Sequence, residues 1–468
     1  GIGVDTEGFE QAMQRQREQA RASWAGSGDA ASDKLWFDLR AEHGSTEFLG
    51  YETTYAQGQV LALVRDGEKV EQADSGDELW LVTNQTPYYG ESGGQVGDTG
   101  TMTGENGAAL RVLDTQKKAE TVTAHHVVID EGAVHNGDTL NQYADARRRD
   151  HIRVHHSVTH LMHEALRQVL GDHVAQKGSY QDDQRTRFDI SHTAVITDDE
   201  IAKIEDIVNK EIRNDTAVET RVMPLEDAQE MGARALFGEK YGDEVRVISM
   251  GSTPEGANTP FSVELCGGTH VGRTGEIGLF KIVEQTSVSA GVRRLEAFAG
   301  AAALNYLNEQ ENRIKQAAGV LKTAPGDLVN RVQSVVEERK KLENEVTSLR
   351  RKLATGGGGE DSTGGGPQVK EIGNYKFTGQ VLDGVPPKEL KGMADDLKNQ
   401  LGSGIITLVA TNEGKASIVV AVTDDLTDSI SAVDLVQVGA QALGGKGGGG
   451  RPDLAQAGGP DAGSANDA

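Results

Sequence analysis

Two short segments of the sequence each carry two metal-ligand side chains four residues apart. His156 and His160 form the first pair, and Cys266 and His270 form the second. Two glycines follow Cys266, and they are expected to let the backbone bend so that both side chains turn toward one point. Imidazole nitrogens and a thiolate sulfur are the ligands that a tetrahedral zinc ion takes. If the pairs meet in the folded chain, they predict one zinc site, and that site marks the active site.

The first pair lies in a segment with helical periodicity, residues 150–171. Its aliphatic residues, such as Leu161 and Leu166, fall on one side of the helix, whereas His156 and His160 fall on the opposite side. We therefore expect the histidines to face a cleft or a second layer of structure. The second pair is distant in sequence, so the site must be assembled by tertiary folding, as catalytic zinc sites often are.

Other residues have a plain interpretation beside a functional one. Gln176 follows the histidine helix in a polar turn and is able to reach a ligand in the same cleft. Basic clusters occur at residues 147–149 with Arg153, and at Arg293 and Arg294. They are either solvated surface or phosphate contacts. Six further histidines are interpreted as surface residues or as neighbours of the ligands, with His163 the strongest exception because it shares the ligand side of the helix: His125, His126, His155, His163, His173 and His192.

Composition bounds the class of protein. The 468 residues are 37% hydrophobic and 4% aromatic, which favours several small domains over one large core. A single cysteine excludes a disulfide framework and favours a reducing, cytoplasmic location. No apolar run is long enough for a transmembrane helix, so no membrane partner is expected. The formal net charge of −25 argues against nonspecific nucleic-acid binding, so an RNA partner would have to meet local basic clusters. The acidic excess is alternatively an adaptation to high salt.

The pattern along the chain predicts an α+β multidomain protein. Alternating segments between residues 46 and 145 predict a small antiparallel β-barrel, interrupted by a glycine-rich structured loop at residues 86–98. Strands at 186–190, 220–224 and 245–249 and helices at 198–215 and 225–232 predict an α+β domain that holds the zinc site. The predicted domains are 1–45, a helical tail of a preceding domain; 46–145, the barrel; 146–300, the zinc-binding domain; 301–354, a helical hairpin or coiled coil; 355–367, a glycine-rich linker; and 368–468, a C-terminal α/β domain.

Two choices about the C-terminal part stay open. Heptad spacing from Leu328 to Leu353 fits a coiled-coil dimer, but it fits equally a monomeric hairpin with residues 304–320 as partner. The glycine-rich loop at residues 444–453 lacks the Gly-Lys-Ser/Thr order of a nucleotide-binding P-loop. Its Lys446 and Arg451 either cradle a nucleic-acid backbone or belong to a plain flexible loop.

These motifs resemble the C-terminal half of the alanyl-tRNA synthetase family. The resemblance rests on four segments in matching order. They are the glycine loop at 89–98, the histidine segment 156–160 with Gln-Lys-Gly-Ser at 176–179, Glu-Leu-Cys-Gly-Gly-Thr-His at 264–270 with Gly-Val-Arg-Arg-Leu-Glu-Ala at 291–297, and the glycine-rich segment 447–459. The family's class II aminoacylation core, with its ATP and alanine sites, is not expected in this chain, and residues 1–45 would be the trailing end of the tRNA-recognition domain.

The resemblance implies a deacylase. It implies hydrolysis of seryl-tRNA(Ala) and glycyl-tRNA(Ala) at one zinc ion, because a synthetic site cannot readily exclude a smaller amino acid or a hydroxyl isostere. Thr159 would hydrogen-bond the serine hydroxyl, Gln176 would orient the ester or water, and Cys266 would complete the catalytic set. Arg293, Arg294, Lys446 and Arg451 would contact tRNA(Ala), and the chain would be a monomer or a homodimer through its C-terminal region.

Alternatives to this hypothesis remain. A free-standing trans-editing deacylase and the editing domain of threonyl-tRNA synthetase share the chemistry, although the C-terminal domain and residues 1–45 disfavour both. A structural zinc module for RNA binding and dimerisation is the alternative from another class. Four protein ligands make a closed site, whereas catalytic zinc usually keeps an open position. Either one ligand is displaced by substrate or water, or the zinc mainly orders the pocket.

Overall fold

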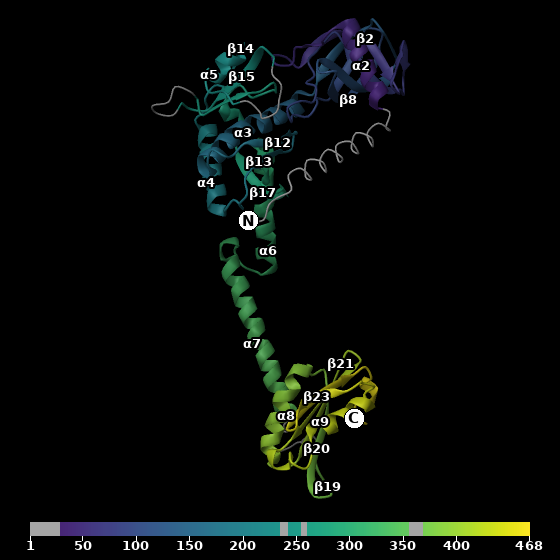
Figure 1. Ribbon diagram of the computed structural model, residues 1–468, viewed down its shortest axis with the longest axis vertical. Helices are drawn as coiled ribbons and strands as arrows, with labels where there is room; N and C mark the ends of the chain where they lie inside the picture. The colour runs from purple at the N-terminus through teal and green to yellow at the C-terminus, as the bar shows by residue number, and fades with distance from the viewer. Residues whose placement is uncertain (1–28, 235–241, 254–259, 355–367) are drawn as a thin grey trace, which may run out of the picture. The chain divides into compact units, whose positions relative to one another are not determined.

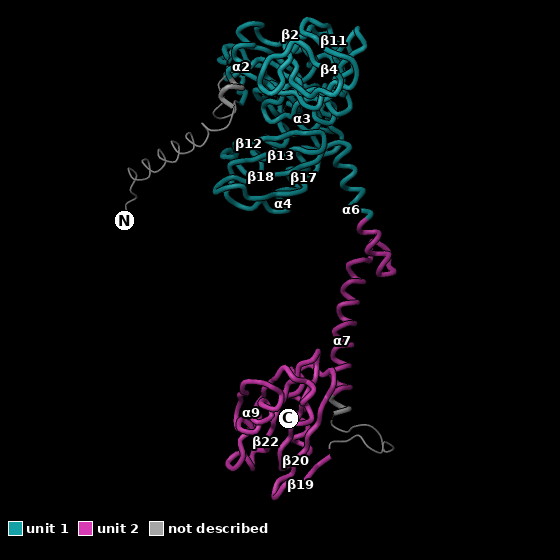
Figure 2. The backbone as a smooth tube through the Cα atoms, turned by 90° about the vertical axis from the view of Figure 1, so that its right-hand side faces the viewer, with its two compact units in different colours: residues 1–312 teal, residues 313–468 magenta. Residues whose placement is uncertain are grey.

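The computed structural model describes residues 29–234, 242–253, 260–354 and 368–468 (Figure 1). The helix predicted at residues 1–25 and the linker predicted at 355–367 lie outside these ranges. The chain forms two compact units, residues 1–312 and 313–468 (Figure 2). The boundary between the units falls inside the predicted helical segment 301–354, within helix α6 (Gly300–Val320).

The first unit begins with a closed antiparallel barrel. Six strands pair in the ring β2-β5-β9-β8-β7-β11, and β11 returns to pair with β2, which closes the sheet. Inward side chains such as Leu63, Leu81 and Val127 are fully buried and fill the interior. The predicted barrel is therefore confirmed. Its strands are β2 (Tyr55–Arg65), β5 (Glu78–Thr83), β7 (Gly100–Gly104), β8 (Ala109–Lys118), β9 (Val122–Glu131) and β11 (Thr139–Ala144), with short strands β1 (Glu47–Phe48), β3 (Glu68–Val70), β4 (Gln72–Asp74), β6 (Gln85–Thr86) and β10 (Ala133–His135) at the edges.

Helix α2 (Asp29–His43) covers one outer face of the barrel. Trp36 and Leu39 are buried against barrel residues that include Val64 and Val82. This segment therefore packs on the barrel, although the sequence pattern assigned it to a preceding domain.

The second half of this unit is an α+β layer built around helix α3 (Ala146–Leu170). The aliphatic side of α3 packs with α4 (Asp198–Arg213) and with a four-stranded antiparallel sheet in the order β12-β13-β18-β17. A second antiparallel sheet has the order β14-β15-β16. The predicted helices and strands of this region are confirmed to within a few residues. The remaining elements are β12 (Gln176–Gln181), β13 (Thr186–Ser191), β14 (Glu219–Pro224), α5 (Leu225–Glu230), β15 (Glu244–Met250), β16 (Ser262–Leu265), β17 (Phe280–Ser289) and β18 (Val292–Ala299).

The second unit contains helix α7 (Leu328–Ala354) and a six-stranded sheet in the order β19-β20-β21-β22-β24-β23. Alternate residues of the central strands bury toward opposite faces. Leu408 and Val419 pack in the core that includes residues of α8, whereas Val409 and Val420 pack in the core that includes residues of α9. The elements are β19 (Val369–Ile372), β20 (Tyr375–Asp383), α8 (Pro387–Leu401), β21 (Ile405–Asn412), β22 (Lys415–Val422), α9 (Ala432–Ala442), β23 (Gly448–Arg451) and β24 (Leu454–Gly459).

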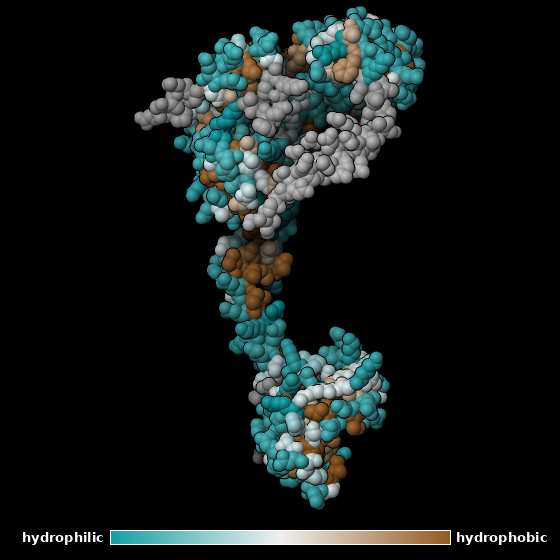
Figure 3. Space-filling model, viewed as in Figure 1, coloured by the Kyte–Doolittle hydropathy of each residue, from teal (hydrophilic) through white to brown (hydrophobic). Residues whose placement is uncertain are grey.

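Two C-terminal expectations change. Four apolar heptad residues of α7 are exposed, among them Leu342 and Leu349 with 59% and 52% of their surface, whereas Leu328 and Val335 are half-buried, so within the described ranges no partner covers most of that stripe. Figure 3 shows apolar surface around the start of α7. A hairpin and a dimer both remain predictions. The predicted glycine loop at 444–453 is in part a strand, because β23 pairs antiparallel with β24 at the edge of the sheet. Among the helices that the structure describes, none has the length and apolar character needed to cross a membrane.

Candidate metal centre

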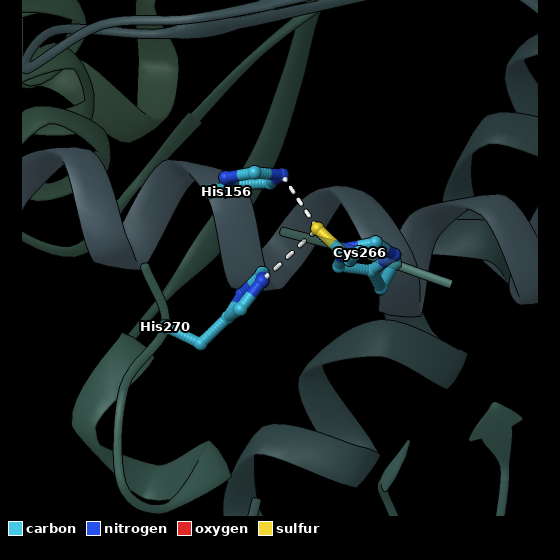
Figure 4. Close-up of side chains that lie close together, drawn as sticks. His156, Cys266 and His270 are labelled. Atoms are coloured by element: carbon cyan, nitrogen blue, oxygen red, sulfur yellow. Dashed lines mark hydrogen bonds between the residues drawn. The ribbon is translucent and has the colours of Figure 1, made fainter. Parts of the chain in front are cut away.

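Four predicted ligands converge on one point. The ligand atoms of His156, His160, Cys266 and His270 all lie within 4.8 Å of one another. Cys266 Sγ lies 3.4 Å from His156 Nε2 and 3.3 Å from His270 Nε2 (Figure 4). Helix α3 supplies the first pair, and the loop after β16 supplies the second.

These distances fit a tetrahedral ion. Zinc–nitrogen and zinc–sulfur bonds of about 2.0–2.3 Å place neighbouring ligand atoms ~3.5 Å apart. The Nε2 atom of His160 is buried and has no hydrogen-bond partner among the described residues. A buried nitrogen without a partner is costly unless something binds it, so the donor set and its geometry suit a metal ion.

Each histidine presents Nε2 to the cluster and contacts a neighbouring side chain through Nδ1. His156 Nδ1 donates to Gln95 Oε1 at 2.8 Å, and His160 Nδ1 donates to Glu264 Oε2 at 2.5 Å. His270 Nδ1 lies 3.1 Å from Ser157 Oγ. Such partners fix the tautomer and the ring orientation of a metal-binding histidine.

Gln95 reaches the cluster from the barrel. Its side chain is fully buried, donates to Thr269 Oγ1 at 2.9 Å and accepts from the Thr269 backbone N–H at 2.9 Å. The glycine loop that carries it is held against the end of β12, because Gln181 N donates to Gly94 O and Val96 N donates to Gln181 O. The barrel therefore contributes directly to the metal centre.

Glu264 connects two histidines of α3. It lies in β16 with 4% of its surface exposed, and its second carboxylate oxygen accepts from His163 Nδ1 at 2.8 Å. His163 Nε2 is buried without a partner like that of His160, but His163 does not belong to the group of four side chains whose ligand atoms lie within 4.8 Å of one another. Burial opposes the charge on Glu264, but His160 and His163 outweigh it and hold the pKa of this carboxyl well below its usual value. Arg234 lies 3.5 Å from the same carboxylate.

The loop that carries Cys266 and His270 is held from outside. Arg246 donates to the backbone oxygens of Cys266 and Gly268 at 2.8 and 2.9 Å, and its guanidinium stacks over the Tyr51 ring. Neither glycine after Cys266 has a positive φ, so the expected bend is not the reason for them. Gly268 is required sterically instead, because a Cβ there would overlap the His156 imidazole.

The electrostatics favour a thiolate at Cys266. Burial opposes its ionisation, but the nearby imidazoles of His156, His270 and His160 outweigh burial and lower the pKa of the thiol well below its usual value. Burial lowers the pKa of His270 to about 3, so its ring is neutral at physiological pH. For His160 burial also opposes the charge, but Glu264 and Cys266 outweigh it and raise the pKa to about 10, so this ring holds a proton beside the thiolate. A metal ion takes a thiolate and neutral imidazoles, so its binding would displace that proton.

The two other predicted catalytic residues have known positions but untested roles. Thr159 is buried, donates to the His155 backbone oxygen at 2.7 Å and lies 2.7 Å from Thr186 Oγ1. Gln176 begins β12, is half-buried and pairs with Ile190 in the sheet. Both contributions to catalysis stay predictions.

The predicted tRNA-binding residues fall into two groups. Arg293 exposes 9% of its surface, and Arg294 is held by Asp189 through bonds of 2.7 and 2.8 Å. Lys446 and Arg451 are exposed in the second unit, where Arg451 lies 3.1 Å from Asp453. The exposed pair is the better suited to meet a phosphate backbone.

The basic run at 147–149 is not a solvated surface throughout. Arg149 is fully buried, and its Nε donates to both carboxylate oxygens of Asp98 at 2.9 and 2.8 Å. Two of the histidines predicted to be surface residues or neighbours of the ligands are internal. His125 is hydrogen-bonded to Thr86 in the barrel, and His155 on α3 exposes only 1% of its surface. Burial of a complete ion pair cannot be read from a run of like charges.

Sequence reasoning did not assign roles to Gln95 and Glu264. Both lay inside segments that had been singled out, the glycine loop and the segment that ends in His270. A carboxylate between apolar Val263 and Leu265 in a short strand was a usable signal for Glu264. For Gln95 there was no signal, because the loop has no periodicity from which a direction can be predicted.

The cluster of three histidines and one cysteine could hold a metal ion, and the chain that carries it is similar to known proteins that act on tRNA. Three family models match. "tRNA synthetases class II (A)" covers residues 1–148, "Threonyl and Alanyl tRNA synthetase second additional domain" covers 245–296, and "DHHA1 domain" covers 374–468. The first match runs through the whole barrel, well past the boundary predicted at residue 45.

Alanine–tRNA ligases are similar over the whole chain. The chain is 55% identical to the ligase of Rhizobium meliloti (strain 1021), covering 100% of this chain and 53% of that protein. It is 53% identical to the ligase of Granulibacter bethesdensis, covering 100% and 52%. The crystallised C-Ala domain of Aquifex aeolicus alanyl-tRNA synthetase is 27% identical over 21% of this chain and 89% of that domain, with a TM-score of 0.21. These sequence matches support the alanyl-tRNA synthetase family, and the chain spans about half the length of the curated relatives it matches.

Proposed function

We propose that this chain hydrolyses the aminoacyl ester of mischarged tRNA(Ala), seryl-tRNA and glycyl-tRNA in particular, at one zinc ion. His156, His160, Cys266 and His270 would hold the ion. The observation that carries the proposal is the convergence of these four side chains. Cys266 and His270 also lie inside the match to the threonyl and alanyl second additional domain. ATP and alanine activation would belong to a part of the enzyme outside the described domains.

Zinc bound there would supply Lewis-acid polarisation of the ester carbonyl or of an attacking water. The chain's own residues do the positioning. Gln95 and Glu264 hold the imidazoles of His156 and His160, and both of these ligands are buried. Cys266 and His270 are half-buried on a loop. If one ligand gives way to substrate or water, we expect it to come from this loop pair, because its surroundings are more open.

The decisive experiment is deacylation of seryl-tRNA(Ala) by purified protein and by Cys266→Ala. We expect the variant to lose activity by more than about 100-fold and to lose bound zinc, since removal of a ligand should exceed the 10–100-fold effect of an outer contact. His126→Ala, a change at a barrel histidine that pairs with Glu78, is the control. Full activity in Cys266→Ala would refute the proposal.

A structural metal module is the second candidate. The closed set of four protein ligands favours it, because structural zinc sites are closed. Bound zinc together with no hydrolysis of any mischarged tRNA would establish it in place of the deacylase.

A further inference from the structure

Two cavities meet at one tyrosine beside the metal centre. The larger, about 470 Å³, is lined by His270, Arg153 and Arg246. The smaller, about 260 Å³, is lined by Tyr89 and Lys117 on the barrel, among other residues. Tyr51 lines both cavities and donates its hydroxyl to Gly267 O at 2.7 Å. Together the two cavities and the Tyr51 ring that they share form a candidate path from the barrel surface to a predicted metal ligand.

The larger cavity lies beside His270, one of the two less buried residues of the cluster. His156 and His160 expose 4% and 7% of their surface, whereas Cys266 and His270 are half-buried. A Cβ added to Gly267 would meet nothing within 4 Å, so the outer side of this loop is open. A substrate that reaches the cluster past this loop would pass through the cavity that His270 lines.

Cations follow the path on an otherwise acidic chain. Arg153 Nε is buried and has no hydrogen-bond partner in the described part of the chain, although its NH1 lies 3.4 Å from Asp150. The Arg246 guanidinium lies 4.2 Å from the centre of the Tyr51 ring, and Lys117 Nζ lies 6.0 Å from that of Tyr89. A guanidinium nitrogen buried without a partner beside a cavity points to an acceptor that the protein does not supply.

The acidic residues on the path do not cancel these cations. Glu120, which lines the smaller cavity, is paired with Arg40 at 2.9 Å. Glu52 lines the larger cavity and is exposed to solvent. Tyr51 exposes 43% of its surface, whereas Tyr89 is buried and serves as a wall of the smaller cavity. An exposed aromatic ring flanked by cations is an arrangement by which proteins hold single-stranded nucleic acid, because a base stacks on the ring and phosphates meet the charges.

We propose that this path, made by Lys117, Tyr89, Tyr51, Arg246 and Arg153, binds the single-stranded 3′ end of the RNA substrate. The terminal nucleotide occupies the larger cavity, with its aminoacyl ester at the metal cluster. The preceding nucleotide passes over Tyr51 toward Tyr89 and Lys117. This inference rests on the proposed deacylase function and adds the residues that recognise the RNA strand.

The test uses the full chain and the variant Lys117→Met, which keeps the aliphatic stem and removes the charge. Lys118→Met is the matched control, because the next residue of β8 points to the opposite face and lies over Trp80. Two substrates are compared, seryl-tRNA(Ala) and serine esterified to adenosine alone. Affinity for an uncharged single-stranded RNA ending in CCA is measured in parallel.

We expect Lys117→Met to lower kcat/KM for the tRNA about 3–10-fold more than for the adenosine ester, and to weaken RNA binding by a similar factor, most strongly at low salt. Arg153→Met should also weaken RNA binding, and Arg147→Met, a change at an exposed arginine of the same helix, is its control. This second pair of variants tests the path if the Lys117 variant fails to fold. If the Lys117 and Lys118 variants behaved alike with both substrates and in RNA binding, the proposed path would be overturned. Hydrolysis by the wild-type protein in the same experiment would still support the deacylase. If wild-type protein hydrolysed neither ester, the deacylase proposal would fail, and the RNA-binding arm alone would decide the path.

Discussion

The candidate metal centre and the C-terminal sheet edge hold their predicted functional residues in opposite ways. At the candidate metal centre His156 and His160 are buried, and each donates a hydrogen bond to another segment. At the sheet edge Lys446 and Arg451 are exposed beside a four-residue glycine-rich strand. The difference teaches that a reaction centre needs side chains fixed by their surroundings, whereas contact with a flexible, charged polymer needs charges that solvent and partner can reach.

The largest effect should follow from breaking the buried pair that joins the barrel to the histidine helix. Arg149→Met leaves Asp98 buried without its partner, and it also removes the bonds from Arg149 to Gly50 O and Pro87 O. We expect a loss of about 3–5 kcal/mol in the free energy of unfolding. Urea unfolding followed by tryptophan fluorescence measures it, because Trp36 and Trp80 both pack on the barrel.

Arg147→Met is the control for this change, since Arg147 is an exposed neighbour on the same helix. It should alter stability by less than about 0.5 kcal/mol. Equal stability of the two variants would mean that Asp98 and Arg149 do not fix the barrel against α3, and the contrast between a fixed centre and a free edge would weaken.

A smaller effect should follow from loosening one metal ligand without removing it. Glu264→Gln replaces the carboxylate that accepts from both His160 and His163. Because an outer partner of this kind orients the ligand and raises its basicity, we expect zinc affinity to fall about 10–100-fold. Competition with a chromophoric chelator measures this without any activity assay.

Glu219→Gln serves as the reference here, because Glu219 is exposed in strand β14 and forms an ion pair with Arg221. It should leave zinc affinity at the wild-type value. Identical zinc affinities in the two variants would show that the carboxylate does not position His160.

The smallest effect belongs to the exposed edge. Lys446→Met should weaken tRNA binding only about 3-fold and reduce the slope of log affinity against log salt by about 1, as loss of one phosphate contact does. Lys415→Met, an exposed lysine at the start of β22, is the comparison variant. A salt slope that changes equally in both, or in neither, would argue against phosphate contact at Lys446.

The sequence by itself determined the four candidate ligands that the fold brings together, the helix that carries two of them and the barrel. Residue type and spacing suffice for these, because an i, i+4 pair lies on one face of any α-helix and alternation of apolar residues sets the inward face of a strand. The strands and helices between residues 186 and 250 follow from the same local patterns.

Tertiary structure decided which residues complete the site. Gln95 comes from a loop without periodicity, and Glu264 lies across the cluster from the helix whose histidines it binds. Arg149 had the same sequence signature as its exposed neighbour, yet it is fully buried against Asp98. The sequence predicted that the glycines after Cys266 bend the backbone. In the structure Gly268 has to be a glycine because a Cβ there would overlap the His156 ring. Local patterns determine which face a residue occupies, whereas burial, pairing and close contact depend on segments that only the folded chain brings together.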